Sequence, residues 1–323
     1  MTVRGEVGVA VEPAIAPARP RPRSRRRWLT RAASPYFLLA PATVVIGAVL
    51  GYPLYLLVKL SFERYGLEEL IAHKGVWIGV QNYTTFIHDP EFWRVLLRTL
   101  IFTAVNVSLT MVLSTLIALL LVRLGRFMRL LLSSGLVLVW AMPVVVAVQV
   151  WAWMVDYEFG VANWFLTELH VGDFHHHDWF ANSLSGFGVI TAVVVWGAIP
   201  FVAITLYAGL AQVPTELLEA ASIDGAAPWR VFKDITFPML KSIFAILTTL
   251  SIIWDFQVFN QVFLMLGNKP TPDYYLMSIY AYIQSFANSE YGLGSAIALM
   301  TVVILLCITF VYVRQMIRAG EVR

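Results

Sequence analysis

The sequence predicts an all-α, polytopic membrane protein with six transmembrane helices. Of its 323 residues, 59% are hydrophobic and only 13% are charged, whereas a soluble domain carries roughly 25% charged residues. A spanning helix needs ~20 largely apolar residues. Six segments meet this requirement, namely residues 35–58, 100–122, 130–154, 186–211, 242–266 and 291–313. Several contain proline, which membrane helices tolerate because neighbouring helices re-satisfy the freed carbonyl groups.

Residues 1–34 are predicted to be a disordered basic tail, and residues 317–323 a second short tail. Seven arginines and four prolines lie within residues 13–31, and like charges and proline oppose helix packing. The first tail could be a nucleic-acid-binding arm or a cleaved targeting segment. We favour a tail held against anionic lipid headgroups, because polybasic segments beside a first span usually set its orientation. The apolar run that follows is longer than a signal-peptide core, which disfavours cleavage.

The distribution of Lys and Arg orients the predicted helices. An even number of spans places both termini on the same side of the membrane. That side would hold 17 of the 23 Lys and Arg residues, including those in the loops after the second and fourth spans. Because positive charge accumulates on the cytoplasmic side of membrane proteins, we expect both termini and the loop at residues 212–238 in the cytoplasm of a multi-pass cell-membrane protein.

The loop at residues 212–238 is predicted to form a helical hairpin. Pro214 suits the first position of a helix, where its missing N–H would have no partner. Gly225 is expected to end this helix, since glycine readily adopts the left-handed conformation. Pro228 would open a second short helix, and Pro238 would precede the return to the membrane.

The side chains of this hairpin favour contact with another molecule. Ala220, Ala221 and Gly225 leave its corner small enough for a close approach. Trp229 and Phe232 are three residues apart and would share one helical face, where an aromatic pair can anchor a protein partner. Spacing alone leaves an alternative open, an amphipathic helix resting on lipid.

Several motifs resemble those of binding-protein-dependent ABC importer permeases. Glu219-Ala-Ala-x-x-Asp-Gly-Ala, followed by Phe232-x-x-Ile235-x-x-Pro238, resembles the EAA loop of that family. The resemblance covers residues 35–316 and is greatest to sugar-type (maltose-like) permeases of the subunit without a large periplasmic insertion. Other motifs that carry it are Gly79-x-x-Asn82-Tyr83, Asp89-Pro90-x-Phe92-Trp93, Gly160-x-x-Asn163 and Tyr291-Gly292-x-Gly294. Three departures are Phe237 for the usual Leu, Ser242 for a common second proline, and Gly267-Asn268-Lys269-Pro270 for Gly-Gly-Pro.

The resemblance implies a type I importer permease domain over residues 35–316. Its EAA helix would dock into a cleft on a cytosolic ATPase dimer, through Glu219, Ala220, Ala221, Asp224, Gly225, Trp229 and Phe232. The other implied partners are a second homologous permease and an extracytoplasmic substrate-binding protein. The ATPase would bind ATP and Mg, because the chain has no Gly-rich phosphate loop of its own. The chain itself would then have no cofactor, metal or catalytic residues, and would move a sugar or oligosaccharide inward by alternating access.

Asp255 is the single Asp, Glu, Lys, Arg or His residue within the six predicted spans. Such residues usually face a cavity and mark a substrate path, although a buried carboxylic acid can also serve only to fix packing. Ser251 lies four residues earlier, on the same helical face. The resemblance aligns both residues, together with Trp140, Trp196 and Phe201, with sugar-contacting positions. For the tryptophans, the alternative is ordinary packing or an interfacial belt.

Three consecutive histidines at residues 175–177 could bind a metal ion. Metal sites usually draw their ligands from spaced positions, so we favour a solvated outer loop. Two other functions stay open. One is an ABC permease for another small solute, such as a polyamine or phosphate, which the poor supply of charged groups in the spans disfavours. The other is a stand-alone secondary transporter, which would predict ionisable residues in several spans.

Overall fold

The computed structural model describes residues 25–318, with side chains described for residues 39–315. The chain divides into two units, residues 1–55 and 56–323. In the first unit the described part is helix α1 (Arg25–Ser61), whose last residues belong to the second. Residues 1–24 of the predicted disordered tail lie outside the described residues, but the prediction is wrong from Arg25 onward. Arginine is a good helix former, and no proline interrupts the segment between Pro22 and Pro35.

The second unit begins with a small non-helical element. Strands β1 (Glu63–Arg64) and β2 (Val76–Trp77) pair antiparallel around α2 (Leu67–Ala72), and α3 (Gln81–Ile87) follows. Asn82 donates from Nδ2 to the carbonyl oxygens of Ser61 (3.0 Å) and Glu63 (2.9 Å). Gly292 lies so close to this segment that a Cβ atom there would collide with the Glu63 carbonyl. Two residues of the resemblance motifs, Asn82 and Gly292, therefore hold the unit's first segment in place.

Among the described residues, five helices are long and apolar enough to cross a membrane. They are α1 from Leu39, α4 (Pro90–Arg123), α8 (Ser183–Leu210), the continuous helix Pro228–Phe256 and α14 (Tyr291–Arg318). A sixth span results if α5 (Arg126–Ala141) and α6 (Val144–Met154) are counted together. The all-α fold and the number of spans agree with the sequence prediction. Helix α14 runs two residues past the predicted end of the domain at residue 316.

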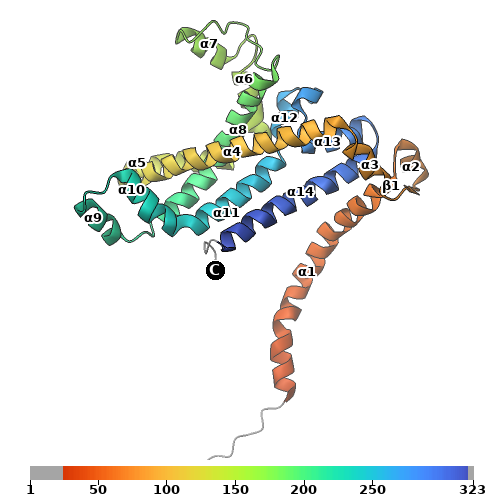
Figure 1. Ribbon diagram of the computed structural model, residues 1–323, viewed down its shortest axis with the longest axis horizontal. Helices are drawn as coiled ribbons and strands as arrows, with labels where there is room; N and C mark the ends of the chain where they lie inside the picture. Colours follow the sequence, from red (N-terminus) through yellow and green to blue (C-terminus); the bar gives the residue numbers. More distant parts are fainter. Residues whose placement is uncertain (1–24, 319–323) are drawn as a thin grey trace, which may run out of the picture. The chain divides into compact units, whose positions relative to one another are not determined.

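The third predicted span, residues 130–154, is not one straight helix. Helices α5 and α6 meet at an angle of 100°, and Figure 1 shows α6 leading away from α5 toward α7 (Val161–Glu168). The break falls at Met142 and Pro143, which both have extended ψ angles (129° and 132°). The residue before a proline is disfavoured in the α-helical conformation, so the bend follows from Pro143.

The fifth predicted span, residues 242–266, has the wrong boundaries. A continuous helix starts earlier as α10 (Pro228–Val231), passes through the π-helical turn η1 (Phe232–Thr236) and continues as α11 (Phe237–Phe256). The chain breaks at residues 257–259, and α12 (Asn260–Met265) is a separate helix. The Val258 carbonyl, freed by the break, accepts a hydrogen bond from the Ser278 hydroxyl at 2.6 Å. A tertiary contact therefore stabilises the break within an unbroken apolar run.

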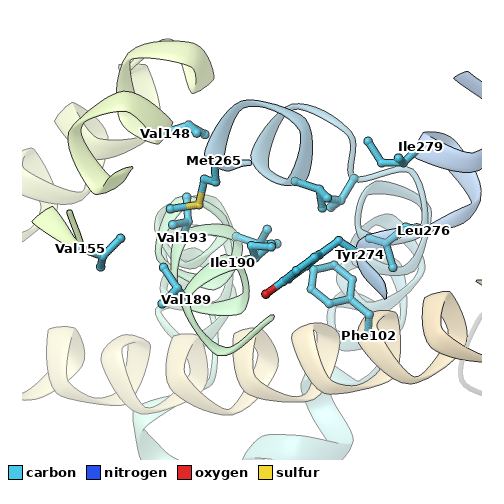
Figure 2. Close-up of a cluster of buried hydrophobic side chains, with 13 residues drawn as sticks. Phe102, Val148, Val155, Val189, Ile190, Val193, Met265, Tyr274, Leu276 and Ile279 are labelled. Atoms are coloured by element: carbon cyan, nitrogen blue, oxygen red, sulfur yellow. The ribbon is translucent and has the colours of Figure 1, made fainter. Parts of the chain in front are cut away.

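Three buried clusters hold the second unit together. The first, shown in Figure 2, joins α8 to α4, α6, α12, the 3-10 turn η2 (Pro272–Tyr274) and α13 (Met277–Tyr282). The second joins α3, α4, α11, α13 and α14 and includes Val95 and Phe256. The third joins α4, α8 and α11 and includes Ala118 and Leu247. Helices α4 and α11 contribute to both the second and the third clusters. The start of α4 (Val95) and the end of α11 (Phe256) belong to the second, and the end of α4 (Ala118) and the middle of α11 (Leu247) belong to the third, so the two helices run antiparallel. A second π-helical turn, η3 (Ile283–Ala287), leads toward α14.

Candidate functional site

The first arm of the hairpin is helix α9 (Thr215–Ile223). Pro214 is its N-cap, with an extended ψ of 127°, so the prediction that it is the first helical residue is wrong by one position. At the other end, the Gly225 N–H donates to the Ser222 carbonyl (3.1 Å) and the Ala226 N–H to the Ala221 carbonyl (2.9 Å). Gly225 has a φ of +69°. This is a Schellman motif, in which a left-handed glycine closes the helix, as the sequence predicted.

The sequence predicted that the second arm is a separate short helix, and this prediction is wrong. The arm starts at Pro228 and joins the membrane helix through η1. In η1 the Phe237 N–H donates to the Phe232 carbonyl, a five-residue spacing. Pro238 follows as the second residue of α11, where it lacks an N–H. The π-helical turn shifts the hydrogen-bond register just before Pro238, so the second arm of the hairpin is continuous with a span.

The exposed surface of the hairpin combines polar and apolar residues. Glu219, Ala220, Asp224 and Gly225 are exposed, whereas Ala221 is buried and Phe232 half-buried. The Trp229 and Phe232 rings stack with centroids 5.8 Å apart, as their spacing predicted. Trp229 is still 71% exposed.

Sequence reasoning missed Ile223, which is 86% exposed at the end of α9. Its residue type did not signal this exposure, because apolar residues of an amphipathic helix are normally expected on the buried face. Exposed apolar patches mark sites of interaction with proteins or with membranes.

A row of aromatic rings links three of the membrane helices. Trp140 of α5 stacks on Phe201 of α8 (centroids 6.2 Å apart), and Phe201 meets the edge of Trp254 of α11 (5.4 Å). Trp140 is 59% exposed. Trp196 does not join this row but packs against Trp151 of α6 at 5.9 Å. Trp254 could not be singled out from the sequence, because a tryptophan in an apolar run looks the same whether it faces a path, lipid or the core.

Ser251 and Asp255 lie on the buried side of α11, the helix that also carries Trp254. Asp255 is only 4% exposed. Helix α4, which packs against α11, carries buried polar residues at Thr103, Asn106 and Thr110, and we call these residues together with Ser251 and Asp255 the polar seam. The unpaired oxygens are Asp255 Oδ2, Thr103 Oγ1, Asn106 Oδ1 and Thr110 Oγ1, none of which has a hydrogen-bond partner among the described residues. Buried polar atoms are normally paired, so this seam is suited to binding polar groups or water.

The loop between α6 and α8 is organised around Asn163. Its Nδ2 donates to the carbonyl oxygens of Asp156 and His177 (both 3.1 Å), and its Oδ1 accepts from Trp179 Nε1 at 2.6 Å. Backbone N–H groups of Phe159 and Glu158 bind the Asp156 carboxylate and lower its pKa. This gives Asn163 of the Gly160-x-x-Asn163 motif a structural role.

The histidines at residues 175–177 do not converge in the described structure. The His176 ring packs on Tyr157 (5.3 Å) and the His177 ring on Trp179 (4.8 Å). Among the described residues, no group of three His, Cys, Asp or Glu side chains is placed to hold a metal ion.

A comparison with protein families bears on residues 110–316. Over this range the chain matches the family described as "Binding-protein-dependent transport system inner membrane component". The chain belongs to this family. It is therefore a permease component of a binding-protein-dependent ABC transport system, as the EAA-type motif indicated.

Similar curated proteins support the assignment. The chain is 44% identical over 299 residues to "Diacetylchitobiose uptake system permease protein DasB" of Streptomyces coelicolor, covering 93% of this permease and 91% of that protein. It is 31% identical over 277 residues to "Sulfoquinovosyl glycerol transport system permease protein SmoG" of Agrobacterium fabrum (86% and 88% covered). It is also 31% identical over 281 residues to "Trehalose/maltose transport system permease protein MalF" of Thermococcus litoralis (86% and 92%).

Solved structures share the fold of this permease. A chain from a bacterial ABC transporter involved in import of the acidic polysaccharide alginate superposes with a TM-score of 0.75 at 19% identity, covering 91% of this permease and 99% of that chain. The same type of transporter in complex with an alginate pentasaccharide-bound periplasmic protein gives a TM-score of 0.73 at 16% identity, covering 92% and 99%. At these identities the likeness concerns the fold alone.

Proposed function

We propose that this permease moves a sugar or an oligosaccharide inward across the cell membrane by alternating access. The observation that carries the proposal is the 44% identity, over 93% of the chain, to a permease named for diacetylchitobiose uptake. Two further relatives are named for sulfoquinovosyl glycerol and for trehalose and maltose. All three named cargoes contain sugar units, which favours a sugar over a polyamine or phosphate.

The proposed substrate path combines the aromatic row with the polar seam. Aromatic faces suit the C–H surfaces of a sugar ring, and Trp140 and Phe201 offer such faces on neighbouring helices. Ser251 and Asp255 supply hydroxyl and carboxyl groups that can bind sugar hydroxyls. Both are buried within this chain, so substrate contact requires α4 and α11 to separate during the transport cycle. Trp196 would line the path beside Trp151.

We propose that transport is powered by a separate cytosolic ATPase dimer, which would bind ATP and Mg. The hairpin α9–α10 would dock into it through Glu219, Ala220, Ala221, Asp224, Gly225, Trp229 and Phe232, with Ile223 added by its exposure. The continuity of α10, η1 and α11 supports this, because motion at the hairpin would reach Asp255 along one helix. A second homologous permease and a substrate-binding protein would complete the transporter. This chain would then have no catalytic residues of its own.

The cargo is tested with the complete transporter in liposomes, supplied with its binding protein and with ATP inside. Uptake of labelled diacetylchitobiose, trehalose and maltose is compared with uptake of a polyamine and of phosphate. We expect uptake of at least one of the sugars and binding of that sugar to the isolated binding protein. Uptake of the polyamine or of phosphate, with no sugar transported or bound, would refute the sugar assignment while leaving the family membership intact.

A further inference from the structure

A large apolar groove lies beneath the hairpin. Its volume is about 820 Å³, and it is lined by the last turns of α4, the end of α8, the hairpin and the start of α11. Leu116 and Leu119 form its α4 wall, and Trp229, Phe232 and Phe244 its opposite wall. Figure 1 shows α9 and α10 at the same end of the unit as the start of α5, which directly follows α4.

The groove carries a charge at one end. Arg123, the last residue of α4, is the single charged residue among those that line it. Within the described part of the chain, Arg123 makes no ion pair closer than 4.0 Å. The guanidinium of Arg129, by contrast, already has hydrogen-bond partners, because it donates to the carbonyl oxygens of Leu121 (2.9 Å) and Leu124 (2.7 Å). An apolar groove that ends at an arginine without an ion-pair partner is complementary to an amphiphile with an anionic head group.

The length of the groove argues for a lipid. Its α4 wall runs from Met111 to Arg123, which corresponds to roughly 18 Å at 1.5 Å per residue. One leaflet supplies about half of the ~30 Å hydrocarbon core, so acyl chains of a single leaflet fit this length.

We propose that this groove binds one anionic phospholipid from the leaflet on the hairpin side, with its acyl chains against α4 and its phosphate on Arg123. Arginine is suited to phosphate because its planar guanidinium donates two parallel hydrogen bonds. Leu218, Ser222 and Trp229 of the hairpin also line the groove, so the bound lipid would support the surface proposed to meet the ATPase. The site does not depend on which cargo is carried.

The test measures lipid retention by native mass spectrometry. The complete transporter is released from bilayers of phosphatidylglycerol and phosphatidylcholine with identical acyl chains. We expect one phosphatidylglycerol to be retained preferentially. Arg123→Gln should lower that preference about fivefold, since one basic residue near the surface contributes ~1 kcal/mol toward anionic lipid. Arg126→Gln is the matched control, because Arg126 is exposed but does not line the groove. Equal retention by the two variants would overturn the proposal.

A second measurement identifies the occupant directly. A benzophenone side chain is placed at Leu116, which is 57% exposed and lines the groove, and in a control at Leu120, which is exposed but lies outside it. After illumination of the complete transporter in the same bilayers, we expect a phospholipid mass adduct at Leu116 that is enriched in phosphatidylglycerol relative to the Leu120 control. A crosslink to a partner subunit would show that the groove holds a helix. That result, or a Leu116 adduct without enrichment, would overturn the proposal.

Discussion

Gly225 is the residue whose backbone the hairpin needs most. Its φ of +69° is left-handed, and a Cβ atom there would meet nothing within 4 Å. Substitution therefore acts through backbone conformation, which costs roughly 1–2 kcal/mol for an ordinary L-residue. We expect Gly225→Ala to reduce sugar uptake by the reconstituted transporter severalfold while membrane insertion stays normal. Gly225→Asn should retain more activity, because asparagine tolerates this conformation. Equal uptake by the two variants would show that the backbone conformation is unimportant.

Asp255 allows a substrate role to be separated from a packing role. Its buried Oδ2 atom has no hydrogen-bond partner among the described residues, and an amide at this position would add N–H donors. Each new buried hydrogen bond contributes ~1 kcal/mol, so Asp255→Asn should leave thermal stability unchanged or slightly raised. Uptake should nevertheless fall at least tenfold if the carboxylate binds substrate. Asp273→Asn, a change at an exposed position, is the control. Normal uptake by Asp255→Asn would restrict this residue to packing.

At the scale of the element, the exposed apolar residues of the hairpin should dominate ATPase binding. Ile223 and Trp229 are the two most exposed large apolar side chains on α9 and α10. Interface anchors of this kind contribute ≥ ~2 kcal/mol, or about 30-fold in affinity. We expect Trp229→Ala and Ile223→Ala each to weaken ATPase binding by about this factor in a pull-down titration. Glu219→Lys should weaken it as well. Leu184→Ala, at the opposite end of α8, should have no effect; unchanged binding by Trp229→Ala would place the interface elsewhere.

The helices themselves were largely predictable, because membrane immersion demands long apolar runs that composition reveals. Their breaks were harder to place. Pro143 was visible in the sequence, but only the surrounding packing decides whether a proline in a span is accommodated or bends the helix by 100°. The fifth span was predicted to begin too late because Pro238 was expected to separate a short helix from the span, whereas a π-helical turn makes the two continuous. The hairpin motif was found because it depends on local residue types; Trp254 was not, because its exposure depends on tertiary packing.

At the scale of the whole molecule, the function depends on which side of the membrane the hairpin occupies. The positive-inside rule predicts that the hairpin lies in the cytoplasm, since 17 of the 23 Lys and Arg residues lie on that side in the predicted topology. The loop between α6 and α8 would then face outward, where a binding protein could reach it. Residues 156–184 of that loop contain no Lys or Arg, in keeping with the outer side.

Cysteine labelling tests this orientation, because the chain has a single native cysteine, Cys307. In a Cys307→Ala background, Ile223→Cys and Val171→Cys place one thiol on each of two exposed sites, on α9 and on the loop after α7. A membrane-impermeant maleimide should label Val171→Cys in intact cells, and Ile223→Cys only after permeabilisation. Co-expression of the ATPase should then protect Ile223→Cys but not Val171→Cys, since only the hairpin would be covered. Labelling of Ile223→Cys in intact cells would put the hairpin outside the cell, beyond the reach of a cytosolic ATPase, and the proposed coupling would have to be abandoned.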